Sequence, residues 1–96
     1  MIGLIATFTV TEENAAAFEA VATELASATR AGEPGNKLYQ LVRNQKEPTQ
    51  FRMMELYADQ AAVEAHMASD WFKAAGPKLM ALIEGRMLLE RYNALS

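Results

Sequence analysis

The sequence of 96 residues contains no cysteine, one histidine and one tryptophan. Without cysteine the chain forms no disulfide, has no thiolate nucleophile and offers no sulfur ligand to a metal. One histidine alone does not build a typical transition-metal site. The few glycines do not form a phosphate-binding or dinucleotide-binding loop. These absences predict a protein without a metal or an organic cofactor.

Charge and hydropathy argue against two further classes of protein. The net charge is −3, and the nine lysines and arginines are dispersed, which does not favour nucleic-acid binding. No apolar run approaches the roughly 18 residues of a membrane-spanning helix, and the first residues lack the basic start of a secretory signal. The composition, 51% hydrophobic and 22% charged, is typical of one folded domain over residues 1–96. We expect a cytoplasmic protein that binds neither nucleic acid nor membrane.

The hydrophobic periodicity predicts strands and helices in a definite order. Alternation with a period of two predicts strands over residues 2–10, 38–43, 51–57 and 87–92. Helical spacing predicts helices over residues 12–31, 60–67 and 71–83. The expected N-caps are Thr11, Asp59 and Asp70, and the expected C-terminal cap of the first helix is Gly32. Gly76-Pro77 should bend or interrupt the last helix, and Gly85 should end it.

This order is the split βαβ pattern of a ferredoxin-like α+β sandwich with an antiparallel sheet. The helices of such a fold cover only one face of the sheet. Apolar residues nevertheless alternate onto both faces, since Leu38 opposes Tyr39 and Met53 opposes Met54. We therefore predict a homodimer in which two copies pack sheet face against sheet face.

His66 is the first candidate for acid–base chemistry, because histidine is the side chain whose ordinary pKa lies near neutral pH. It follows Ala62 by four residues and Val63 by three, beside the helix face that meets the sheet. A base at an apolar cavity and a hydrogen-bonded packing residue are both compatible with this position.

Glu55 is the second catalytic candidate, since it places a carboxylate between apolar neighbours on a predicted strand. If Glu55 faces inward, it needs a partner such as His66 or Arg43, or its pKa is raised. A salt bridge across the sheet to Arg52 or Arg91 is the structural alternative.

Further side chains could bind a planar substrate. Rings that could enclose it belong to Tyr39, Tyr57, Trp71 and Phe72. Asn36 could bond to a carbonyl or phenolate oxygen, and Arg43 could stabilise an oxyanion. The alternatives are core packing for the aromatic residues, a turn role for Asn36, and an ion pair or solvent exposure for Arg43.

Four segments carry a likeness to a known family. They are Met1-Ile2-Gly3-Leu4-Ile5-Ala6, Glu33-Pro34-Gly35-Asn36 ahead of Tyr39, Glu55-Leu56-Tyr57, and Glu64-Ala65-His66-Met67-Ala68-Ser69 followed by Phe72-Lys73. In this order they resemble the antibiotic biosynthesis monooxygenase family. The resemblance implies a dimeric α/β barrel of ferredoxin-like subunits. Haem-degrading relatives carry a histidine, an asparagine and a tryptophan where this chain has Gly76, Thr7 and His66, so haem degradation is disfavoured.

The resemblance also implies a reaction, namely cofactor-independent oxygenation of a small apolar aromatic substrate by dioxygen. His66 would deprotonate a phenol, quinol or anthrone, whose anion gives an electron to dioxygen. Two alternatives stay open. One is an isomerase or dehydratase of a small carbonyl compound, in which His66 and Glu55 move protons. The other is a ligand-binding or stress-response module without catalysis.

Overall fold

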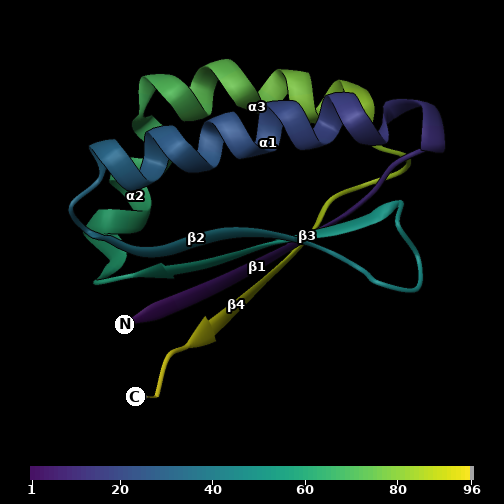
Figure 1. Ribbon diagram of the computed structural model, residues 1–96. Helices are drawn as coiled ribbons and strands as arrows, with labels where there is room; N and C mark the ends of the chain where they lie inside the picture. The colour runs from purple at the N-terminus through teal and green to yellow at the C-terminus, as the bar shows by residue number, and fades with distance from the viewer. Residues whose placement is uncertain (96) are drawn as a thin grey trace.

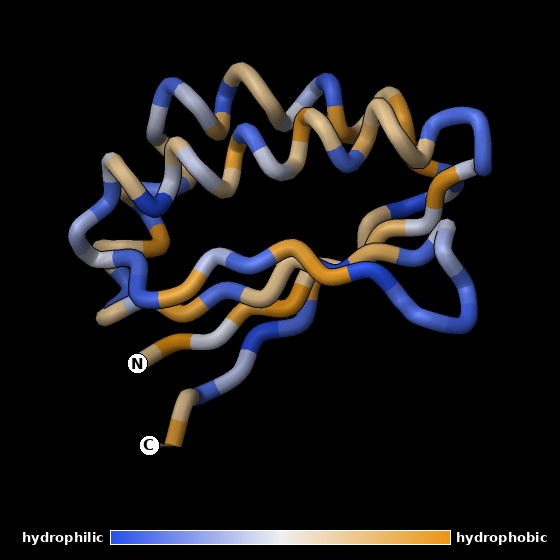
Figure 2. The backbone as a smooth tube through the Cα atoms, in the orientation of Figure 1, coloured by the Kyte–Doolittle hydropathy of each residue, from blue (hydrophilic) through white to orange (hydrophobic). Residues whose placement is uncertain are grey.

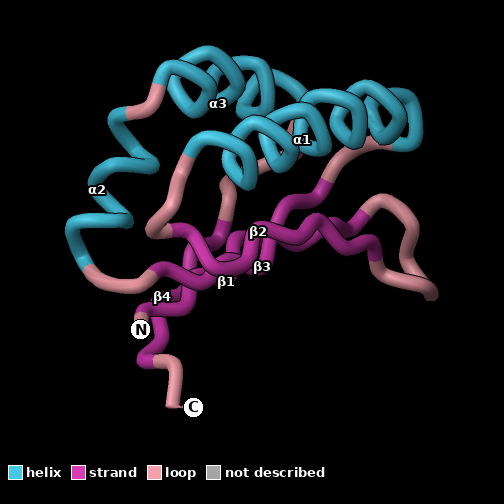
Figure 3. The backbone as a smooth tube through the Cα atoms, turned by 60° about the vertical axis from the view of Figure 1, so that its left-hand side comes forward, coloured by secondary structure: helices cyan, strands magenta, loops and turns pink. Residues whose placement is uncertain are grey.

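The computed structural model describes residues 1–95 of the protein. The elements in chain order are β1 (Ile2–Thr9), α1 (Glu12–Gly32), β2 (Asn36–Arg43), β3 (Gln50–Tyr57), α2 (Gln60–Ala68), α3 (Asp70–Leu82) and β4 (Leu88–Asn93). The strands pair antiparallel in the order β2-β3-β1-β4. The helices cover one face of the sheet (Figure 1 and Figure 3). The predicted ferredoxin-like α+β fold is confirmed.

Side-chain alternation along the strands builds the core between sheet and helices. On β3, Phe51, Met53 and Tyr57 are buried, whereas Met54 on the opposite face is exposed. The ring of Phe18 on α1 lies 5.0 Å from that of Phe8 and 5.0 Å from that of Phe51. Figure 2 shows hydrophobic residues recurring along the strands and a hydrophilic loop between β2 and β3. The sheet face toward the helices is therefore the core face.

Two of the predicted helix N-caps are confirmed. Thr11 Oγ1 accepts a hydrogen bond of 3.2 Å from the backbone N–H of Asn14. Asp59 Oδ1 accepts one of 2.9 Å from the backbone N–H of Ala62. Each cap satisfies a backbone donor that has no partner inside its helix.

The predicted cap of α3 is wrong by one residue, because Ser69 and not Asp70 is its N-cap. Ser69 Oγ accepts from the backbone N–H of Phe72 at 3.2 Å and donates to the backbone oxygen of His66 at 2.6 Å. Asp70 lies in the first turn instead, where a carboxylate is favourable at the positive end of the helix dipole. One residue thus ends α2 and begins α3, which holds His66 close to Phe72.

The end of α1 also differs from the prediction. The helix includes Gly32, and the C-cap is Glu33, whose backbone N–H donates to the Thr29 oxygen at 3.0 Å. Gly32 is needed for packing rather than for capping. A Cβ atom at this position would lie 2.6 Å from the ring of Trp71. The start of α3 therefore packs directly on the last turn of α1.

Smaller differences concern the ends of other elements. α3 is not interrupted at Pro77 but continues to Leu82, and Gly85 adopts a φ of +67° in the turn that follows. Val10 lies outside β1 and forms an isolated bridge with Ile83. Within residues 1–95, no helix has both the length and the apolar character needed to cross a membrane.

The contact at Gly32 yields a prediction about stability. Gly32→Ala should destabilise the fold by about 1–3 kcal/mol, because the new methyl group forces the Trp71 ring out of its place. Urea denaturation followed by the fluorescence of the single tryptophan measures both the loss and the displaced ring. Gly76→Ala is the matched control. No atom lies within 4 Å of a Cβ placed there, so its stability should stay within about 1 kcal/mol of the parent. Equal effects of the two substitutions would contradict the packing role of Gly32.

Candidate functional site

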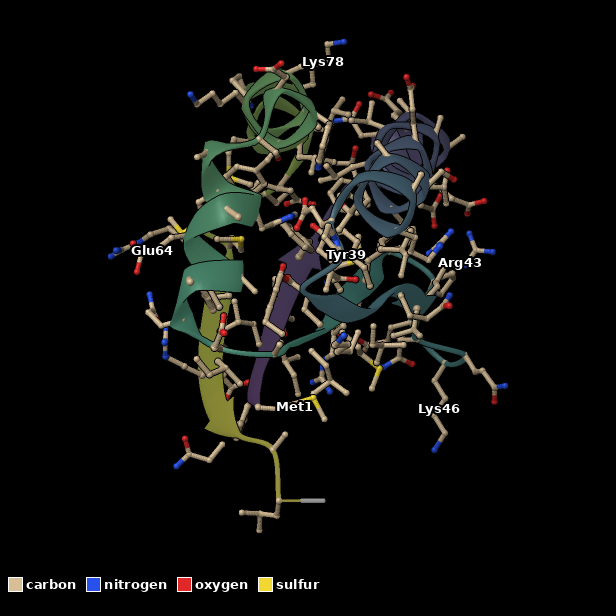
Figure 4. All side chains as sticks on the ribbon, turned by 90° about the vertical axis from the view of Figure 1, so that its left-hand side faces the viewer. Met1, Tyr39, Arg43, Lys46, Glu64 and Lys78 are labelled. Carbon is tan, nitrogen blue, oxygen red and sulfur yellow. The ribbon has the colours of Figure 1, made fainter. Side chains whose placement is uncertain are left out.

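The sheet contributes a buried carboxylate and two tyrosines. Tyr39 on β2 and Glu55 on β3 are directly paired across the strands, and both are buried under the helices. Tyr57 lies two residues further along β3 and is also buried. Figure 4 shows Tyr39 in the interior between helices and sheet. The prediction left open which sheet face Glu55 occupies, and the structure places it on the core face.

The helices contribute a second buried carboxylate, which holds the histidine. Oε2 of Glu33 lies 2.9 Å from Nδ1 of His66 and accepts a hydrogen bond of 2.6 Å from Nε1 of Trp71. The side chains of His66 and Glu33 are 4% and 7% exposed. Because burial removes most of the screening by water, this contact is stronger than an ion pair at the surface. Glu33 joins the ends of three helices at one point.

The partner of Nδ1 decides which nitrogen of His66 can accept a proton. An ionised carboxylate only accepts hydrogen bonds, so the neutral ring carries its hydrogen on Nδ1 and has its lone pair on Nε2. Within residues 1–95, the fully buried side-chain polar atoms without a partner are Thr29 Oγ1 and Glu33 Oε1. Nε2 is not among them and forms no hydrogen bond with a described residue, so it is the ring nitrogen left to accept a proton. The pair is oriented as in a carboxylate–histidine base.

Aromatic rings surround the histidine. The centroid of the His66 ring is 4.8 Å from that of Phe72, 5.0 Å from that of Tyr39 and 5.6 Å from that of Tyr57. Phe72 is only partly buried and is the outermost of these rings. We call the group of Glu33, Tyr39, Glu55, Tyr57, His66, Trp71 and Phe72 the Glu33–His66 cluster. The cluster places a proton acceptor, Nε2 of His66, beside the flat apolar faces of aromatic rings.

The predicted charged partners of Glu55 are wrong. The hydroxyl of Tyr57 donates to Oε1 of Glu55 at 2.6 Å, and no lysine or arginine of residues 1–95 forms an ion pair with this carboxylate. His66 bonds to Glu33 and Arg43 to Glu19 instead. Arg52 points to the other sheet face, and Arg91 bonds to Gln60. Burial raises the pKa of Glu55 to about 7, the Tyr57 hydrogen bond opposes this increase, and the charge of Glu33 adds to it. Glu55 can therefore exchange a proton near neutral pH.

The phenolic groups act as hydrogen-bond donors rather than as bases. Burial, followed by the charge of Glu55, raises the pKa of Tyr39 well above its ordinary value, and the pKa of Tyr57 is raised for the same reasons. The Tyr57 hydroxyl is used by Glu55, whereas that of Tyr39 bonds to no described residue. Tyr39 can therefore donate a hydrogen bond to a ligand oxygen beside His66.

Two of the predicted substrate-binding residues lie outside the cluster. Arg43 is half exposed, pairs with Glu19 at 2.9 Å and points to the outside of the molecule (Figure 4). Asn36 donates to the backbone oxygen of Leu38 at 3.0 Å and serves the irregular start of β2. Trp71 reaches the cluster through its N–H, while its ring packs over Gly32. The structure thus brings together the other predicted residues but not Arg43 or Asn36.

Glu33 was not among the predicted site residues, although it lies in the segment Glu33-Pro34-Gly35-Asn36 that carries the family resemblance. A usable signal was present, because an acidic residue at a helix C-terminus faces the negative end of the dipole and is unfavourable without a specific partner.

The apolar cavity that the sequence analysis associated with a base at His66 is not among the described hollows of the surface. One of these lies between α1 and β2 beside Arg30 and Arg43, and another lies between α1 and α3. Closely packed rings surround His66 instead.

The raised pKa of Glu55 predicts a dependence of stability on pH. At the ordinary pKa of 4.5 the unfolded chain loses its proton, whereas the folded protein keeps it up to about pH 7. The folded state therefore binds more protons between these values, so stability falls as the pH rises through this window. Glu55→Gln should remove this loss, which is on the order of 3 kcal/mol at most. Urea denaturation of both proteins between these pH values measures it, and parallel pH profiles would contradict the assignment.

Comparisons with known proteins identify the family of the fold. The family model described as "Antibiotic biosynthesis monooxygenase" matches residues 1–78, which include the whole Glu33–His66 cluster. A comparison with curated proteins finds no match.

Solved structures of proteins classed with this family are similar over almost the whole chain. One from Caulobacter crescentus is 38% identical, covers 99% of this chain and 90% of its own, and has a TM-score of 0.94. One from Deinococcus radiodurans is 25% identical, covers 100% of this chain and 94% of its own, and has a TM-score of 0.90. From the family match and these similarities, we conclude that the chain belongs to the antibiotic biosynthesis monooxygenase family.

Proposed function

We propose that the protein is a monooxygenase that oxidises a small quinol-like or anthrone-like substrate with dioxygen and without metal or flavin. The observation that supports this most is the Glu33–His66 pair, which orients a buried histidine with Nε2 free beside aromatic rings. Membership of a family named for monooxygenases supports the reaction class. The substrate supplies the electrons, so the protein has to provide a base, a hydrogen-bond donor and a largely dry site.

The proposed chemistry balances without an external reductant. Nε2 of His66 takes a proton from an activated CH2 or phenol group, and the substrate anion gives one electron to dioxygen. The two radicals combine to a peroxide, and the proton on His66 returns as water leaves. In an anthrone-like substrate, one CH2 group and one dioxygen thereby become one carbonyl group and one water. A quinol and one dioxygen become a hydroxyquinone and one water. The Tyr39 hydroxyl donates to the developing oxyanion, and Phe72, the outermost ring, moves aside to admit the substrate.

Two other functions are supported by particular observations. The close packing around His66 supports a binding module without catalysis. In such a module, the hydrogen bond between His66 and Glu33 would only stabilise the packing of the helices. Glu55, with a pKa of about 7, and His66 together suit an isomerase that moves protons within a carbonyl compound. Dependence of turnover on dioxygen separates the isomerase from the monooxygenase.

His66→Gln tests the role of the base. The glutamine amide still offers a donor to Glu33 but cannot accept a substrate proton as imidazole does. We expect kcat in oxygen-uptake assays with quinols and anthrones to fall by about 100-fold or more, with urea stability close to the parent. Met67→Gln is the matched control, since Met67 is a neighbour on α2 with 58% exposure. Turnover of His66→Gln within a few-fold of the parent would reject His66 as the base.

We also propose that the outer sheet face packs against the same face of a second copy. Exposed apolar side chains on this face come from β2, β3 and β4 and are Leu38, Val42, Met54, Leu88 and Tyr92. Arg52 and Glu90 occupy the same face, so a two-fold axis can bring opposite charges together. All six residues of β4 are exposed, and this strand runs away from the helices (Figure 1). An apolar face of this extent is typical of an interface.

Sedimentation at micromolar concentration tests this dimer. The parent should sediment as a dimer, and Met54→Glu should sediment as a monomer because it places charges in the buried interface. Met80→Glu is the control: Met80 is 43% exposed and Met54 39%, but Met80 lies on α3 on the other side of the sheet. A monomeric parent, or equal behaviour of the two variants, would reject the interface.

A further inference from the structure

The Glu33–His66 cluster holds two carboxylates, and no lysine or arginine of residues 1–95 is paired with either of them. Glu33 and Glu55 are both 8% exposed as residues. The hydrogen bonds to their carboxylates come from His66, Trp71 and Tyr57, of which only histidine can become a cation.

The basic side chains that approach these strands are used elsewhere. Arg30 is exposed and donates to the backbone oxygen of Tyr39 at 2.6 Å. Arg43 is paired with Glu19, and Arg91 is bonded to Gln60. A ligand that reaches Nε2 of His66 therefore meets carboxylates and phenol groups rather than a guanidinium or ammonium group.

We infer that this site accepts neutral aromatic substrates and rejects those that carry a carboxylate or phosphate group, with Glu55 as a specificity-determining residue. This inference rests on the proposed function, because it assigns the substrate class of the same site. A like charge about 6 Å away, at an effective dielectric constant of about 20, lowers affinity by roughly 100-fold. Solvent at the edge of the site reduces this factor, so we expect discrimination of at least about tenfold.

A pair of probes that differ in charge but have the same ring tests the inference. The probes are 2,5-dihydroxybenzoic acid and its methyl ester, which share the hydroquinone ring. Binding is measured at about pH 8, above the pKa of about 7 that Glu55 has in the folded protein, so that its carboxylate is ionised. It is followed without dioxygen by the fluorescence of Trp71, which contacts Glu33 directly. The parent should bind the ester at least about tenfold more tightly than the acid. Equal affinity, tighter binding of the acid, or failure of both probes to bind would overturn the inference.

Two variants test whether Glu55 causes the difference in affinity between the ester and the acid. Glu55→Gln should lower the ratio of the two affinities at least about threefold, and comparing ratios cancels any general loss of binding. Glu64→Gln removes the same charge from the outward side of α2, where Figure 4 shows the side chain pointing away from the interior, and should leave the ratio unchanged. An unchanged ratio in Glu55→Gln, or an equal change in both variants, would overturn the role of Glu55.

Oxygen uptake with the same probes keeps this inference separate from the proposed function. Selective binding of the ester without any oxygen uptake would support the charge selection and count against the monooxygenase. Oxygen uptake with equal preference for acid and ester would support the monooxygenase and overturn the charge selection.

Discussion

The arrangement of the helices depends on the hydrogen bonds of the Glu33 carboxylate. This carboxylate stands at the end of α1 and binds His66 of α2 and Trp71 of α3 through the same oxygen atom. Burying a carboxylate is costly, and the position at a helix C-terminus adds to this cost. Two charge-assisted hydrogen bonds offset it. Oε1 of the same carboxylate is buried without a hydrogen-bond partner, which lowers stability. A residue that served stability alone would not be expected to carry this cost.

Several backbone features serve this carboxylate. Trp71 can reach Glu33 because Gly32 has no side chain, since a Cβ there would overlap the indole ring. Ser69 joins α2 to α3 without a loop, so His66 and Phe72 face one another across the turn. Each of these residues fixes one side chain of the cluster. Small residues at the ends of helices thus determine the geometry of the candidate base.

The local patterns predicted most of the fold but only part of the site. Strands and helices follow from the alternation and spacing of apolar residues, which is why the strand and helix order and the caps at Thr11 and Asp59 were predictable. His66 and Glu55 were found because their residue types are unusual at their positions, and Tyr39 because its ring could enclose a planar substrate. The position of Glu33 at a helix C-terminus indicates that it needs a partner, but the partners lie 33 and 38 residues away and no local pattern identifies them.

The wrong assignments have the same origin. Arg43 lies on the right strand, but alternation alone does not show that Glu19 of α1 lies close enough to bind it. Ser69 and not Asp70 caps α3 because α2 continues to Ala68 and the same Ser69 is its C-cap, which the spacing of apolar residues did not show. The partner of Glu55 was sought among charged residues, whereas burial favours a neutral donor such as Tyr57.

Strand β3 connects the candidate site to the other face of the sheet. Its inward residues include Glu55 and Tyr57, and its outward residues include Met54 and Leu56. Because successive side chains alternate between the faces, any contact that fixes the outer residues also fixes the register of the inner ones. A second copy on the outer face would therefore stabilise the strand that carries Glu55 and Tyr57. Dimerisation and the chemistry of the site would then depend on the same eight-residue strand.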